Sequence, residues 1–66
     1  MQNLSRTAVI DYTNWKGERR LRTIEPKLLF YGSTHDHQDV QWLLIALDVE
    51  KNEERTFAMK EIHSWA

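Results

Sequence analysis

A cluster of basic side chains in the first half of the chain has the chemistry to hold an anion. Residues 16–27 carry five basic side chains against two glutamates, a local charge of +3 in a chain whose formal net charge is −1. Arginine binds phosphate or carboxylate through two parallel hydrogen bonds. The alternative to an anion-binding surface is a solvated basic face that is attracted to the acidic part of the same domain. That acidic part is residues 35–61, where three basic and seven acidic side chains give a local charge of −4. The basic residues are Lys16, Arg19, Arg20, Arg22 and Lys27.

The overall charge limits the class of anionic partner. Binding of duplex DNA grows with the number of phosphates that a protein neutralises, and a chain of net charge −1 is poorly suited to it. A compact ligand with one to a few phosphates fits the composition better.

Catalytic and metal-binding motifs have little support. The chain contains no cysteine, no Gly-rich phosphate loop and no serine in a Gly-x-Ser-x-Gly context. His35 and His37 can offer two metal ligands, with Asp36, Asp39 or His63 as the third. Nothing in the sequence fixes their geometry, so we favour a solvated loop. We expect a non-enzymatic domain with no metal and no cofactor. A miniature hydrolase that uses Asp48 and a histidine is the alternative.

Apolar residues alternate with a period of two along most of the chain, which predicts strands over 7–13, 18–25, 28–31, 41–49 and 55–59. Asn14 and Gly17 are typical of a hairpin turn, and Pro26 marks a strand end because it cannot donate to a ladder. A helical turn is expected over 60–65. Five short strands in one 66-residue domain (1–66) predict an all-β fold, a small barrel whose closure removes exposed edges.

Large aromatic residues are placed both in the expected core and at exposed positions. Tyr12 and Trp42 lie on predicted core faces, and Trp42 begins a strand that is apolar on both sides. Trp15 at a hairpin tip and Trp65 near the C-terminus favour a contact with a second copy or a protein partner. The longest apolar run, 42–47, is too short for a membrane helix, and the N-terminus has no apolar stretch typical of a secretory signal. We therefore expect a cytoplasmic domain without membrane contact.

The order of several short motifs resembles that of the WYL domain over residues 8–63. The resemblance implies an SH3-type, Sm-like barrel that senses a ligand, with nucleotides or single-stranded nucleic acid favoured. The family usually follows a DNA-binding helix-turn-helix in bacterial transcription regulators; we expect none here, and short stand-alone members of bacteria and phages are most similar. Leu43 stands where the family signature has tyrosine. The motifs are Ile10-x-Tyr12, Gly17, Arg22-x-Ile24-x-Pro26, Leu28, Trp42-Leu43-Leu44-x-Ala46-x-Asp48, Arg55-x-Phe57-x-Met59 and Ile62.

The resemblance also implies which residues contact the ligand. Arg22 and Arg55 match the family's arginines, and this hypothesis requires that the two guanidinium groups meet in one concavity. The chemistry of the residues themselves adds three candidates: Tyr12 and Trp42 would give aromatic support by stacking on a base, and Arg20 of the basic segment would add a further contact. The alternatives are that the aromatic residues belong only to the core, and that Arg55 forms a structural salt bridge with Asp48 or Glu53. In that case the domain is a self-associating or protein-docking module without a small ligand.

Overall fold

The computed structural model describes residues 6–66 as an all-β domain, which confirms the predicted fold class. Its strands are β1 (Ala8–Thr13), β2 (Arg19–Gly32), β3 (Gln41–Asp48), β4 (Glu53–Ala58) and β5 (Ile62–Trp65), with a 3-10 turn, η1 (Met59–Glu61), between β4 and β5. Within the described range, no helix is long and apolar enough to cross a membrane. Residues 1–5 lie outside the described range. They belong to the predicted domain and to the N-terminus for which no secretory signal is expected.

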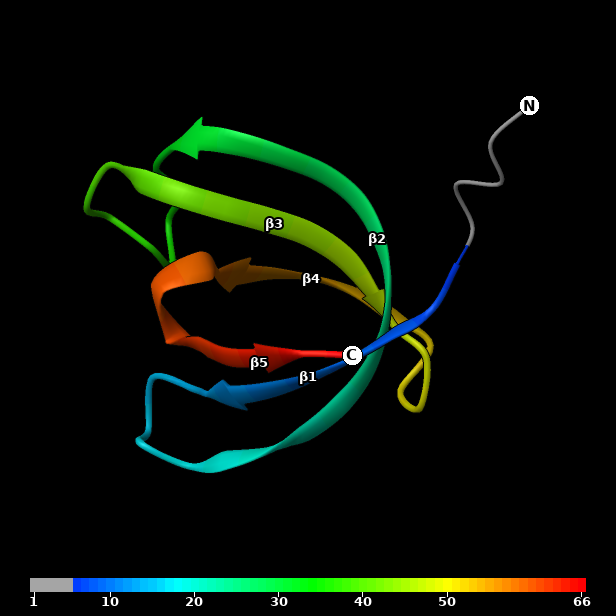
Figure 1. Ribbon diagram of the computed structural model, residues 1–66. Coiled ribbons are helices and arrows are strands. Elements are labelled where there is room, and N and C mark those ends of the chain that lie inside the picture. The colour runs from blue at the N-terminus through cyan, green and yellow to red at the C-terminus, as the bar shows by residue number, and fades with distance from the viewer. Residues whose placement is uncertain (1–5) are drawn as a thin grey trace.

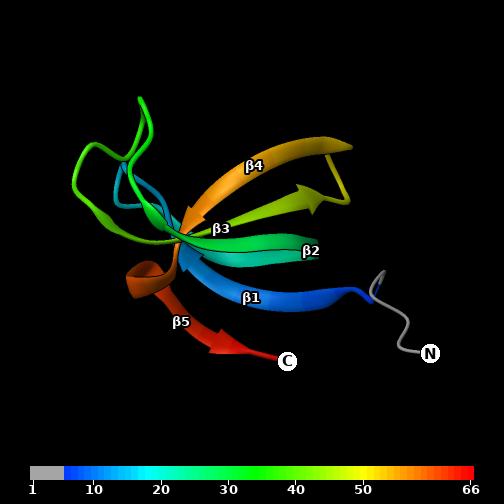
Figure 2. The same cartoon turned by 90° about the horizontal axis from the view of Figure 1, so that it is seen from above.

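All five strands form one antiparallel sheet in the order β4-β3-β2-β1-β5. The long strand β2 sweeps around the domain from the β1 side to the β3 side (Figure 1). Because η1 alone separates β4 from β5, the two edges of the sheet come together at that end, and the strands spread apart away from it (Figure 2). The pairings among residues 6–66 include no β4–β5 ladder, so the predicted barrel is not closed. The domain is a half-open roll.

Two predicted elements differ in their bounds from those observed. The predicted strands 18–25 and 28–31 are one strand, β2, because Lys27 bulges out where the pairing with β3 shifts between Pro26 and Leu28. Such an irregularity accommodates a proline, which has no N–H for the ladder. The helical turn expected over 60–65 is confined to η1, and the residues after it form β5, which pairs with β1.

The core lies on the inner side of the curved sheet. Alternate residues of each strand point inward, and Ile10 and Ile24 are fully buried there. The two-sided strand β3 also buries Leu43 on the outer side, whereas Trp42, at the beginning of β3, is 54% exposed. The inner cluster of buried residues consists of Ala8, Ile10, Tyr12, Ile24, Leu44, Ala46 and Phe57.

The β1–β2 hairpin is fixed by local hydrogen bonds. The side-chain oxygen Oδ1 of Asn14 accepts hydrogen bonds of 2.9 Å from the backbone N–H groups of Lys16 and Glu18. Gly17 has a φ of 83°, a left-handed conformation that glycine adopts without steric cost. On the outer face, Arg19 donates two hydrogen bonds of 2.9 Å to Asp11, which lower the pKa of that carboxyl. Arg19 is therefore engaged away from the inner side of the sheet.

Candidate functional site

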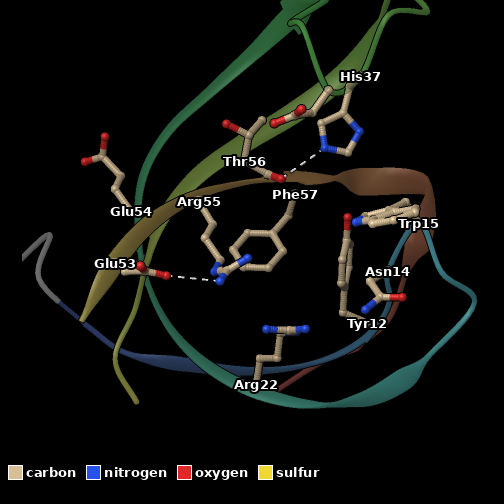
Figure 3. A pocket seen from close by; sticks show the side chains of 11 residues that line it. Tyr12, Asn14, Trp15, Arg22, His37, Glu53, Glu54, Arg55, Thr56 and Phe57 are labelled. Atoms are coloured by element: carbon tan, nitrogen blue, oxygen red, sulfur yellow. Dashed lines mark hydrogen bonds and ion pairs between the residues drawn. The ribbon is translucent and has the colours of Figure 1, made fainter. Parts of the chain in front are cut away.

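A pocket of about 860 Å³ lies where β4 faces the β1–β2 hairpin (Figure 3). Its walls come from β1, the hairpin tip, β2, β4 and the loop between β2 and β3. It brings together side chains that are far apart in the sequence. The lining residues are Tyr12, Asn14, Trp15, Arg22, Asp36, His37, Glu53, Glu54, Arg55, Thr56 and Phe57.

The guanidinium groups of Arg22 and Arg55 meet in this pocket, over one carboxylate. Arg22 Nη1 donates a 3.1 Å hydrogen bond to Asp48 Oδ2, and Arg55 Nε lies 4.0 Å from the same oxygen. The register of the sheet explains the meeting, because Asp48 of β3 pairs with Ile24, two residues beyond Arg22 on the same face of β2. The two guanidinium groups thus meet in one concavity, as the ligand hypothesis requires, and each of them also has an acidic partner.

The salt bridges considered as the alternative are present as well. Arg55 Nη2 donates a 3.0 Å hydrogen bond to Glu53 Oε1, and both side chains of this pair are largely exposed, at 41% and 62%. An exposed pair contributes only about 0–1 kcal/mol, so Arg55 can exchange Glu53 for a ligand. The Arg22–Asp48 pair is buried, and Arg22 is held in place by it.

Arg22 keeps unused donor capacity. Its side chain is more than nine-tenths buried, and its Nε has no hydrogen-bond partner. A guanidinium carries five N–H donors, and a buried donor without a partner costs free energy. A ligand that presents acceptors to this guanidinium would reduce that cost.

Tyr12 and Phe57 form the aromatic wall of the pocket. Their rings meet edge to face with centroids 4.9 Å apart. The Tyr12 hydroxyl accepts a 3.2 Å hydrogen bond from the Ala58 N–H at the free edge of β4. Burial raises the pKa of Tyr12 above its ordinary value, so the ring enters the site as a neutral phenol.

The loop between β2 and β3 closes one side of the pocket. The His37 ring nitrogen Nε2 lies 3.1 Å from the Thr56 carbonyl oxygen, and the Thr34 N–H donates a 2.8 Å hydrogen bond to the His37 carbonyl. His37 therefore serves as a contact between the loop and β4, and the neighbouring His35 is exposed. In the part of the chain that the structure describes, no group of three His, Asp or Glu side chains is placed to hold a metal ion.

Two predicted site residues do not line this pocket. Trp42 packs edge to face on Tyr31, its partner across β2 and β3, with ring centroids 5.3 Å apart, and lines a second hollow with Met59 and Lys60. Arg20 is exposed and is not among the residues that line the pocket around Arg22 and Arg55, which we call the arginine pocket. The structure therefore does not place Trp42 and Arg20 in the pocket that holds Arg22 and Arg55, and whether either residue contacts a ligand stays a prediction.

The structure adds residues that the sequence did not reveal as part of the site. Trp15, assigned to a partner contact, is 87% exposed and lies at the mouth of the pocket. Its position three residues after Tyr12, on the hairpin that continues β1, is the only sequence signal for this placement. Asp36 and His37 belong to the segment that the sequence marked only as a possible source of metal ligands, and Glu54 comes from a charged stretch without a recognisable motif.

The WYL domain family matches residues 3–66, nearly the whole chain, so the chain belongs to this family. WYL domains are ligand-sensing regulatory modules, and the family assignment gives the chain that general role. No curated protein and no solved structure is significantly similar to it. The signature tyrosine that Leu43 replaces would lie on the outer side of β3, because Leu43 alternates with the inward-facing Leu44 and Asp48. The substitution therefore does not alter the arginine pocket.

Proposed function

We propose that this WYL domain is a cytoplasmic, non-enzymatic sensor that binds a nucleotide or a short single-stranded nucleic acid in the arginine pocket. The observation that carries the proposal is the meeting of Arg22, Arg55 and the Tyr12–Phe57 wall in a single pocket. Guanidinium donors beside aromatic faces suit a ligand that combines a flat ring with hydrogen-bond acceptors.

The two arginines have different tasks in this proposal. Arg22 is fixed by Asp48 and orients the ligand, whereas Arg55 leaves Glu53 and closes on it. Trp15 is free to stack on a base from the mouth of the pocket, and such stacking contributes about 1–3 kcal/mol per base. Ligand binding then changes the contacts of β4 and of the loop that His37 attaches to it.

Replacing Arg55 with alanine is expected to weaken ligand binding by about tenfold or more, because a hydrogen bond to a charged group contributes about 1.5–3 kcal/mol. The measurement is isothermal titration calorimetry against the four nucleoside monophosphates and short single-stranded oligonucleotides. Arg19→Ala is the matched control, since it removes the same charge from the outer face. Absence of binding to every ligand, or equal affinities of the two variants, would contradict the proposal.

A contact with a second copy or with a protein partner is the second candidate function, and exposed tryptophan favours it. Trp65 is 50% exposed on β5, an edge strand of the sheet. If this surface mediates self-association, sedimentation velocity at rising protein concentration should show a larger species that Trp65→Ala removes. Trp15→Ala is the companion variant, and a chain that stays monomeric throughout would remove self-association as a function.

A further inference from the structure

The arginine pocket carries more acidic than basic side chains. Asp36 and Glu53 line the same space as Arg22 and Arg55, and Glu54 lies at its rim with its carboxylate turned outward (Figure 3). The carboxylate of Asp48 beneath the two arginines adds another negative charge. A strongly charged phosphate group entering the pocket would meet this negative surplus, and like charges repel. The part of the ligand that enters is therefore its ring and not its phosphate.

The ligand that fits such a lining has acceptors on one edge and N–H donors on the next. The guanidinium groups can only donate, and the ionised carboxylates can only accept. Arg55 and Glu53 place a donor group and an acceptor group side by side, at 3.0 Å. The buried, under-used guanidinium of Arg22 adds further donor capacity at the same end of the pocket.

Resting on the proposed function, we infer that the pocket is selective for guanine. Guanine presents the acceptors O6 and N7, the pair that arginine binds in a bidentate way, and carries a donor amino group at N2. Its N1–H lies beside that amino group, so a single carboxylate can accept from both. Adenine and cytosine each have one amino donor and no adjacent ring N–H. In the complex, the acceptor edge of guanine lies on the arginine pair and its donor edge lies on Glu53.

The aromatic lining favours a base over a free amino acid, which is the other class of ligand that carries both hydrogen-bond donors and acceptors. A free amino acid also pairs a carboxylate with arginine and an ammonium group with glutamate. Trp15 at the mouth of the pocket offers an exposed ring face, which a planar purine uses and the backbone of an amino acid does not, and the largely buried Tyr12–Phe57 pair gives the pocket an apolar wall.

The test compares guanosine with inosine, which differs from it only by lacking the N2 amino group. Calorimetry on the wild-type chain should give an affinity for guanosine at least about tenfold above that for inosine, since one bidentate pair discriminates by about 1–3 kcal/mol. Glu53→Gln should reduce this ratio to less than about threefold, because the amide cannot accept from both donors. Glu50→Gln, in the exposed β3–β4 turn, is the matched control and should keep the wild-type ratio.

Each outcome separates this inference from the proposed function. Equal affinities for guanosine and inosine, or a ratio unchanged in Glu53→Gln, would overturn guanine selectivity while nucleotide binding stands. Binding of nucleoside monophosphates but of no nucleoside would have the same meaning, because the phosphate would then be the recognised group. Binding of free amino acids and of no nucleoside or nucleotide would overturn both proposals.

Discussion

Replacing Asp48 with asparagine should lower the free energy of unfolding by about 3–5 kcal/mol, because removal of one partner leaves a buried charge uncompensated. Asp48 is 2% exposed and is the hydrogen-bond partner of Arg22. Domains of this kind have about 5–15 kcal/mol of stability in total. Urea unfolding followed by circular dichroism measures the change.

Two further variants make the Asp48 result specific. Glu25→Gln breaks an exposed ion pair of 2.8 Å with Lys27, and it should change the stability by less than about 1 kcal/mol. The double substitution Arg22→Met with Asp48→Leu removes both charges, so it should recover much of the stability that Asp48→Asn loses. An Asp48→Asn protein as stable as the wild type would mean that Arg22 does not depend on its carboxylate. The double variant should also lose the ligand, because it removes a pocket guanidinium.

Replacing Phe57 with alanine is expected to lower the free energy of unfolding by about 3–5 kcal/mol, through lost burial and the cavity left behind. Phe57 is 2% exposed, belongs to the inner cluster and packs edge to face on Tyr12. Thermal unfolding followed by circular dichroism at several protein concentrations measures the effect.

The control for Phe57→Ala is Trp15→Ala, an equally large aromatic truncation at an 87% exposed position. A surface change of this kind should stay within about 0.5 kcal/mol of the wild type. If the two variants were equally destabilised, Trp15 would be buried in solution and its placement at the mouth of the pocket would be wrong. If neither were destabilised, Phe57 would not be a core residue.

The strands themselves could be predicted because their signal is local. The alternation of Ala8, Ile10 and Tyr12 with more polar neighbours needs only the two-residue period of an extended chain. The turn signal of Asn14 and Gly17 is equally local, and both residues act as expected. The prediction that a strand ends at Pro26 was wrong, because a strand can continue past a proline where a bulge interrupts the pairing. That bulge depends on the pairing of β2 with β3, which the local sequence does not reveal.

The candidate site was predictable only in part. Arg22 and Arg55 were selected by resemblance to the family, and Tyr12 by its position on the same inner face. Trp42 was misplaced relative to them, because it lies at the beginning of β3, whereas Asp48, which contacts the two arginines, is the last residue of that strand. The alternation of residues along β3 predicted the correct face for Trp42, but it could not predict which end of the strand lies at the pocket. Whether these residues bind a ligand stays a prediction.

The sequence by itself determined the all-β class, the family and the inward-facing positions, since alternation, turn residues and motif order are properties of neighbouring residues. The tertiary structure alone decided that Arg22 and Arg55 share Asp48, that Trp15 lies at the pocket, and that the roll stays open between β4 and β5. These features depend on strand register and on the curvature of the sheet, which arise from contacts between segments distant in the chain.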